Sequence, residues 1–106
     1  MEEHRVVVTG LGVISPVGND VATFWSSLKE GKSGIDTLTT FDASAFDSRI
    51  AGEVKGFDPQ AYGLSKKDTH RMEKFVQYAI ACSKQVITDS HIDLTKIDKE
   101  RVGVTI

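Results

Sequence analysis

The sequence is poor in cysteine, in histidine and in long apolar runs, and each shortage excludes a class of protein. Its single cysteine, Cys82, cannot form an intramolecular disulfide, so a disulfide-stabilised secreted domain is excluded. One thiol and three scattered histidines show no metal-ligand spacing, and we predict neither a metal site nor a cofactor. No stretch approaches the ~18 consecutive apolar residues of a membrane span, and we expect no contact with a membrane.

The chain also lacks an excess of either charge. It carries 13 Lys and Arg against 15 Asp and Glu, a net charge of −2. The overall charge therefore gives no indication that the chain binds nucleic acid. The first residues, "MEEHRVVV", lack the basic start and apolar centre of a signal peptide, and we expect a protein of the reducing cytoplasm. With 106 residues, 40% of them hydrophobic, the chain amounts to at most one globular domain.

Three regular elements are expected in the first half of the chain. The run "RVVVTG", residues 5–10, is β-branched and closes on glycine, which predicts a strand buried on both faces. Glycines 10, 12 and 18 are expected to permit tight turns in the loop that follows. Asn19 or Asp20 can then cap a helix over residues 21–28, with Gly31 just past its end. The pattern weakens from residue 32 to 63, where residues 49–54 suggest one short strand.

A long helix and a second strand are expected after residue 63. Ser65 and Asp68 form a capping-box pattern, which predicts one helix from there to about Asp89. Its apolar stripe is Met72, Phe75, Val76, Ala79, Ser83, Val86 and Ile87. The apolar run over residues 101–106 predicts a second buried strand. The order of elements favours an α/β fold with a mostly parallel sheet, and a chain that stops on a buried strand suggests part of a larger domain.

Two short motifs suggest a chemical role, a nucleophilic cysteine and a dinucleotide-binding loop, and the residues around them favour neither. Cys82 is expected near the middle of the long helix, where the helix dipole does little to activate a thiol, so packing is the favoured role. Gly10 and Gly12 after a strand resemble a dinucleotide-binding fingerprint, but Ser15 occupies the place of the third glycine and Pro16 delays the helix. A nucleotide site is therefore a distant alternative.

One local cluster of charge stands out in this acidic chain. Lys66, Lys67, His70 and Arg71 gather around the expected helix start. A solvated helix turn is the simpler interpretation, and a docking surface for an acidic partner is the more specific one.

Several stretches together resemble a known family. They are "RVVVTGLGVISPVGND", "FWSSLKEGKSGI", "GEVKGFDP", "RMEKFVQYAI" and "RVGVTI". The combination resembles the N-terminal part of the β-ketoacyl-[acyl-carrier-protein] synthases, the thiolase-like condensing enzymes, and in particular their synthase II type. The resemblance spans essentially the whole chain, and the ketosynthases of polyketide pathways share much of it.

The resemblance implies a layered, thiolase-like α/β fold and a cytoplasmic homodimer. It implies a decarboxylative Claisen condensation, in which an acyl group on an active-site cysteine is attacked by a carbanion derived from malonyl-carrier protein. The family's catalytic cysteine and two histidines belong to segments without counterpart in residues 1–106. We therefore expect these residues to be the N-terminal portion of a synthase domain, with no catalytic residue and no activity alone.

The resemblance also gives the cation cluster a role. The family's basic carrier-protein docking stretch aligns with residues 65–72, so Lys66, Lys67 and Arg71 are the candidate docking residues for acyl carrier protein. His70 stands where the family often has a permanent cation. A non-catalytic module that binds carrier protein remains the alternative of a different class.

Overall fold

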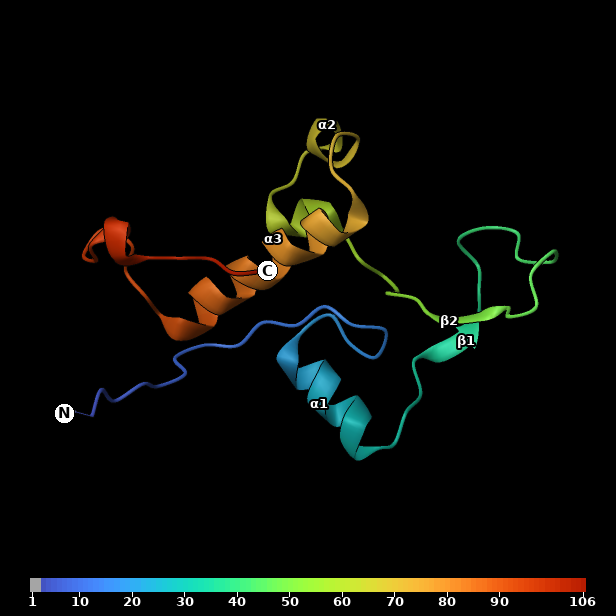
Figure 1. Cartoon of the computed structure of the whole chain (residues 1–106), viewed down its shortest axis with the longest axis horizontal. Helices are drawn as coiled ribbons and strands as arrows, with labels where there is room; N and C mark the ends of the chain where they lie inside the picture. The colour runs from blue at the N-terminus through green and yellow to red at the C-terminus, as the bar shows by residue number, and fades with distance from the viewer. Residues whose placement is uncertain (1–2) are drawn as a thin grey trace.

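The computed structural model describes residues 3–106 as an open arrangement of helices around one extended N-terminal segment (Figure 1). Three α-helices, two short strands and two 3-10 turns are assigned within these residues. In chain order they are α1 (Val21–Lys29), β1 (Ile35–Thr37), β2 (Ile50–Gly52), η1 (Pro59–Tyr62), α2 (Lys66–Thr69), α3 (Lys74–Ser90) and η2 (Lys99–Arg101).

Helix α1 forms where its caps predict it. The Asp20 side chain accepts hydrogen bonds from the Thr23 backbone N–H and hydroxyl, both at 2.8 Å, which satisfies a free donor of the first turn. The same bonds hold the pKa of Asp20 below its ordinary value. The helix ends at Lys29, and Gly31 adopts a positive φ of 66° that suits glycine. Both predicted ends of this helix are confirmed.

The two predicted buried strands do not form within the described residues. Residues 5–10 and 102–106 are extended but belong to no ladder, and Val6, Val8 and Val104 are 89%, 80% and 79% exposed. A β-strand needs a neighbour to receive its backbone hydrogen bonds, and no segment between residues 3 and 106 supplies one here. The apolar pattern therefore identifies two extended segments, and neither is paired with another strand within residues 3–106.

The sheet that does form is antiparallel, which corrects the expected parallel one for this part of the chain. β1 and β2 pair with Ile35 opposite Gly52 and Thr37 opposite Ile50, at the base of an arm that extends away from the helices (Figure 1). The strand predicted within residues 49–54 is confirmed as β2, and its partner β1 was not predicted. Glu53 closes the arm by accepting hydrogen bonds from residues 39 and 40, which lower its pKa to about 2.

The predicted long helix is interrupted between residues 70 and 73. The capping box of Ser65 and Asp68 is confirmed, but α2 ends at Thr69 and α3 begins at Lys74. The Gln77 side-chain amide fills the break, donating to the carbonyl oxygens of Thr69 at 3.3 Å and Met72 at 3.0 Å. These bonds replace the helical hydrogen bonds that the break removes. No glycine or proline marks the position, so the sequence pattern gave no sign of it.

Helix α3 buries a different face from the one predicted. Gln77 and Ala81 are buried, whereas Phe75, Val86 and Ile87 of the predicted stripe are 68%, 36% and 41% exposed. The N-terminal segment approaches α3 closely at Cys82 and Gln85, and the Gln77 amide lies in the break before α3. The large apolar side chains of α3 are left uncovered by the rest of residues 3–106.

The described residues enclose little core. A cluster of Phe57, Tyr62 and Tyr78 joins η1 to α3, with ring centroids 5.8 and 4.9 Å apart. Among residues 3–106 the buried apolar side chains are those of Ala43, Leu64 and Ala81. The radius of gyration is 17.4 Å, against the roughly 13 Å of a compact domain of this size. The segment is thus a framework whose apolar surface is largely exposed.

Candidate functional site

The glycine-containing N-terminal segment lies directly against α3. A Cβ atom at Gly12 would stand 2.4 Å from the Cys82 carbonyl oxygen, so Gly12 serves close packing rather than a turn. Gly18 closes the expected tight turn, in which its carbonyl oxygen accepts from the Ser15 backbone N–H at 2.9 Å. The backbone N–H of Leu11 donates to Asp89 Oδ2, and that of Val13 donates to Gln85 Oε1, both at 2.9 Å. Because these donors are occupied and no space remains, a phosphate has no cradle here. The nucleotide-site alternative is therefore wrong.

Gln85 holds this junction together, and the sequence interpretation missed it. Its Nε2 donates hydrogen bonds to the Asn19 carbonyl oxygen at 2.7 Å and to the Tyr62 hydroxyl oxygen at 3.1 Å. Together with the bond from Val13, one amide thus joins the N-terminal segment, η1 and α3. The sequence does contain a sign of this role. Gln85 lies one helical turn after Ala81, and a polar side chain next to a small residue can reach the backbone of a neighbouring segment.

Cys82 occupies the mid-helix position that the sequence predicts. It is a free, half-buried cysteine, and its Sγ makes no hydrogen bond with any residue from 3 to 106. An activated thiol needs a nearby cation, a paired histidine or a helix N-terminus, and Cys82 is eight residues into α3. Its backbone carbonyl faces Gly12. The surroundings of Cys82 are those of a packing residue.

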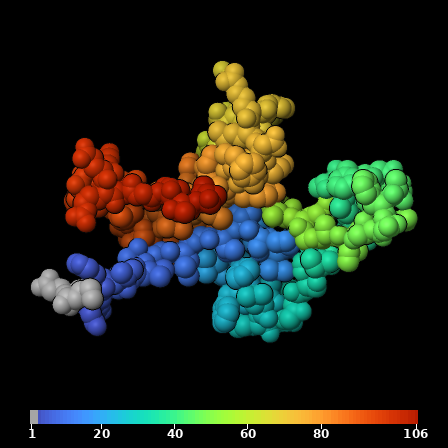
Figure 2. Space-filling view, in the orientation of Figure 1, coloured from blue at the N-terminus to red at the C-terminus, as the bar shows by residue number. Residues whose placement is uncertain are grey.

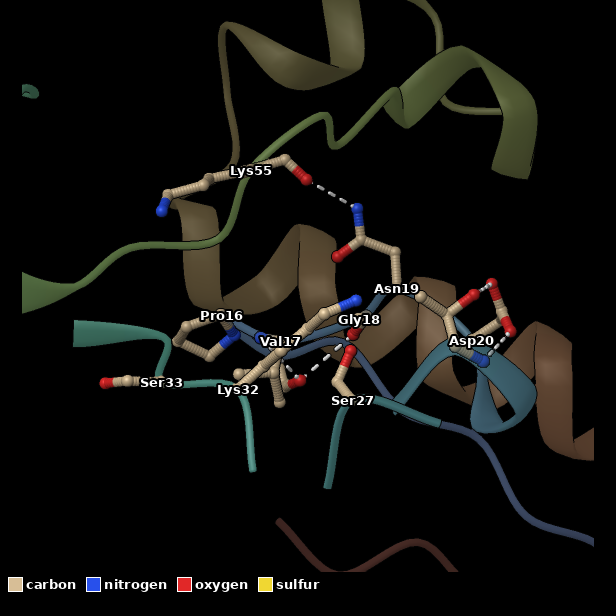
Figure 3. A pocket seen from close by; sticks show the side chains of 11 residues that line it. Pro16, Val17, Gly18, Asn19, Asp20, Ser27, Lys32, Ser33 and Lys55 are labelled. Atoms are coloured by element: carbon tan, nitrogen blue, oxygen red, sulfur yellow. Dashed lines mark hydrogen bonds between the residues drawn. The ribbon is translucent and has the colours of Figure 1, made fainter. Parts of the chain in front are cut away.

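A polar hollow of about 430 Å³ lies beside the same junction (Figure 3). Its walls include the turn over residues 15–20, Ser27 of α1, Lys32 and Lys55. The ammonium of Lys32 is paired with Glu30 at 2.7 Å, and Asn19 Nδ2 donates to the Lys55 carbonyl oxygen at 2.8 Å. The hydroxyl of Thr23 and the carboxylate of Asp20 also line the hollow, 2.8 Å apart, but this pair forms the N-terminal cap of α1. The hollow marks where the arm meets the helices.

The predicted cation cluster lies at α2. The side chains of Lys66, Lys67 and Arg71 are exposed, and none forms an ion pair with a residue in the range 3–106. Lys66 and Lys67 belong to α2, whereas Arg71 follows in the next turn, with its N–H bonded to the Asp68 carbonyl at 2.9 Å. The three residues are thus close in the chain but do not share one continuous helix, which corrects the expectation of a single long one.

Asp68 is the acidic residue inside the cluster, and its carboxylate is hydrogen-bonded to Ser65. Asp68 Oδ2 accepts from the Ser65 hydroxyl at 2.6 Å and from the Ser65 backbone N–H at 2.9 Å. These bonds, with a smaller contribution from Arg71, hold the pKa of Asp68 below its ordinary value. Helix α2 projects from the body of the molecule in Figure 1, and the space-filling view shows the same projection (Figure 2). The cations of this projection are therefore open to a partner.

Other kinds of site are not seen in the described part of the chain. No three His, Cys, Asp or Glu side chains within residues 3–106 lie close enough together to hold a metal ion. None of the described helices has the length and apolar character needed to cross a membrane.

Comparison with known proteins identifies the family. Residues 3–106 match the family model "Beta-ketoacyl synthase, N-terminal domain". The chain is 49% identical over 106 residues to 3-oxoacyl-[acyl-carrier-protein] synthase 2 of Vibrio harveyi, and 46% identical to the protein of that name from Coxiella burnetii. It is 38% identical over 105 residues to the synthase 2 of Staphylococcus aureus strain COL. The chain spans 25% of the length of each of these relatives.

A solved structure shows the same fold. The ishigamide ketosynthase/chain length factor superposes with a TM-score of 0.75 at 31% sequence identity, over 86% of this chain and 22% of that one. The chain therefore belongs to the β-ketoacyl synthase family, as its N-terminal domain segment, and the resemblance and the thiolase-like α/β fold class predicted from the sequence are confirmed.

Proposed function

We propose that this chain is the N-terminal part of a 3-oxoacyl-[acyl-carrier-protein] synthase that elongates fatty acids. The names of the relatives support this, since proteins 38–49% identical to the chain over 105 or 106 residues are called 3-oxoacyl-[acyl-carrier-protein] synthase 2. The reaction is a decarboxylative Claisen condensation of an acyl thioester with malonyl-carrier protein. A polyketide ketosynthase is the alternative, since the solved neighbour at 31% identity is named a ketosynthase/chain length factor.

The reactive groups of this enzyme are expected in segments beyond residue 106. The complete enzyme is proposed to act as a cytoplasmic homodimer, and residues 1–106 alone to be inactive. A stand-alone binding module fits the structure less well, because the described residues enclose so little apolar core.

Within the complete enzyme, we propose that Lys66, Lys67 and Arg71 dock the acyl carrier protein. The observation that carries this proposal is the projection made by α2 and the turn after it, which presents three exposed cations without ion pairs to residues 3–106. Asp68 offsets part of this charge, and its hydrogen bonds to Ser65 hold its carboxylate in the capping box. Such a surface suits an acidic partner that must bind briefly and leave, because exposed charge pairs are weak and accelerate association.

The test reverses two of these charges in the full-length enzyme. Lys67→Glu combined with Arg71→Glu replaces two attractions by two repulsions. We expect a roughly 10- to 100-fold loss in kcat/KM for carrier-bound substrates, at ~1.4 kcal/mol per decade. The loss appears mainly in KM, because docking precedes the chemical step, and it shrinks at high salt as the charges are screened.

Two controls make the result specific. Small thioester mimics without the carrier protein should react at the normal rate with the double variant. Lys96→Glu combined with Lys99→Glu makes the same change in net charge at two exposed positions remote in sequence from α2, and should leave kcat/KM within about twofold. Equal losses for mimic and carrier substrates would assign the cluster a structural role, and unchanged kinetics would leave it as a solvated turn.

A further inference from the structure

The polar hollow beside the junction is lined by a buried serine whose hydroxyl has no partner in the described part of the chain. Ser27 of α1 is only 6% exposed, and its Oγ makes no hydrogen bond with any residue from 3 to 106. In Figure 3 this hydroxyl points from α1 toward the turn that contains Gly18, into the hollow. Buried hydroxyls normally have a partner, because leaving one unmet costs free energy. The Ser27 hydroxyl is therefore placed to bond a group that enters the hollow.

Two lysines from the two ends of the β1–β2 arm are fixed at the same hollow. The backbone N–H of Lys32 donates to the Ser27 carbonyl oxygen at 3.0 Å. The carbonyl oxygen of Lys55 accepts from Asn19 Nδ2 at 2.8 Å. Both lysines line the hollow, as Figure 3 shows. These backbone bonds hold the bases of two cationic side chains beside Ser27, although the three residues come from separate parts of the chain.

The charges around the hollow favour an anion. Lys32 Nζ lies 2.7 Å from Glu30 Oε2, and since an ammonium has three donors, this pair leaves others available. Lys55 Nζ is 4.0 Å from Asp36 Oδ2, which is too long for a hydrogen bond. The acidic residue among the lining side chains is Asp20, and its carboxylate accepts the capping bonds from Thr23. Two cations against one carboxylate give the lining a net charge of +1.

We propose that this hollow binds a small anion that carries a phosphoryl group, held by the Ser27 hydroxyl and by the ammonium groups of Lys32 and Lys55. A phosphoryl group offers three acceptor oxygens and a carboxylate only two, so the phosphoryl group suits three donors on separate segments. The volume of about 430 Å³ lies within the ~300–1,000 Å³ of small-molecule sites and leaves room for an organic part. The site shares no residue with α2, and its ligand joins both ends of the arm to α1.

The experiment titrates the full-length enzyme with inorganic phosphate, and separately with glycerol phosphate, in a calorimeter. Ionic strength is kept constant with chloride. We expect saturable binding by the unchanged enzyme, weakened about fivefold in Ser27→Ala, which loses one hydrogen bond to a charged ligand. Lys32→Met combined with Lys55→Met should weaken it by at least about tenfold. Phosphate should also raise the melting temperature of the unchanged enzyme more than that of either variant.

Matched controls use the same substitutions away from the hollow. Ser83→Ala changes an exposed helical serine of α3, whose hydroxyl bonds the Ala79 carbonyl oxygen at 2.8 Å. Lys29→Met combined with Lys99→Met removes the same charge at two exposed positions that do not line the hollow. Both controls should keep the Kd for phosphate within about twofold of the unchanged enzyme.

Three results would overturn the proposal. Titrations without saturable binding of either compound would show that the hollow is not an anion site in the complete enzyme. Equal losses from the two lysine pairs would mean that phosphate responds to net charge alone, and an unchanged Kd in Ser27→Ala would place the anion outside the hollow. If the predicted losses are observed, the two compounds then distinguish the source of the phosphoryl group. Tighter binding of glycerol phosphate identifies an organic phosphate as the ligand, and equal binding identifies free phosphate.

Discussion

Two regions of this molecule are built in opposite ways: the junction of the N-terminal segment with α3, and the projecting α2. At the junction, backbone meets backbone so closely that Gly12 has no room for a Cβ, and the amide of Gln85 joins three parts of the chain. At α2, Lys66, Lys67 and Arg71 extend into solvent, and hydrogen bonds close to them in sequence hold the short helix.

The contrast separates substitutions that should change the free energy of unfolding from substitutions that should change binding. At the junction, any added atom must displace a carbonyl of α3, so a change there alters the free energy of unfolding. At α2 and the turn after it, the side chains of Lys66, Lys67 and Arg71 make no hydrogen bond or ion pair with residues 3–106, so their replacement is expected to alter binding alone. Each of the following substitutions tests that division, in full-length enzyme.

The largest effect is expected from Gly12→Ala. The new methyl group would lie 2.4 Å from the Cys82 carbonyl oxygen and 3.0 Å from the Gln85 Cβ, so the segment must move away from α3. We expect a loss of about 3 kcal/mol in the free energy of unfolding, measured by urea denaturation. Gly31→Ala is the matched control: its added methyl meets no atom within 4 Å, and only the positive φ of 66° costs about 1 kcal/mol. A smaller loss at Gly12 than at Gly31 would contradict the close contact.

An intermediate effect is expected from Gln77→Met, which connects the two regions. The substitution removes the two donors that hold the break between α2 and α3, but it also removes a buried oxygen, Gln77 Oε1, that has no partner among residues 3–106. Since these changes partly offset each other, we expect a loss of about 1 kcal/mol in stability. If Lys66, Lys67 and Arg71 dock the carrier protein as proposed, KM for carrier-bound substrates should rise about threefold, because the turn that carries Arg71 loses the bonds from Gln77.

The readout that identifies Gln77 as a positioning residue is the difference between substrates. Small thioester mimics should keep their KM in Gln77→Met, because they make no use of α2. Gln60→Met, at an exposed glutamine of η1, should change neither stability nor KM. A rise in KM that is the same for mimics and carrier substrates would mean that Gln77 supports the fold in general.

The smallest effect is expected from Cys82→Ala. The thiol is half-buried and has no hydrogen-bond partner in the described chain, so its loss removes a little packing and no chemistry. We expect condensation activity within about twofold of the unchanged enzyme and a stability loss below about 1 kcal/mol. Abolished turnover in a folded Cys82→Ala protein would show that the thiol takes part in the reaction.

The sequence predicted the local features of this chain well. The Asp20 cap, the glycine after α1 and the Ser65–Asp68 capping box are all confirmed, because each depends on residues within a few positions of one another. The cation cluster was visible for the same reason. Its role in docking stays a prediction until the charge reversal is made.

What the sequence by itself determined, then, was the family, the helix caps and the positions of Cys82 and of the cation cluster. Only the tertiary structure decided that α3 buries the side bearing Gln77 and Ala81, that the helix breaks before Lys74, and that the runs over residues 5–10 and 102–106 find no partner strand within residues 3–106. The physical reason is range. A cap is satisfied by its own neighbours, whereas the buried face of a helix and the pairing of a strand depend on segments far away in the sequence.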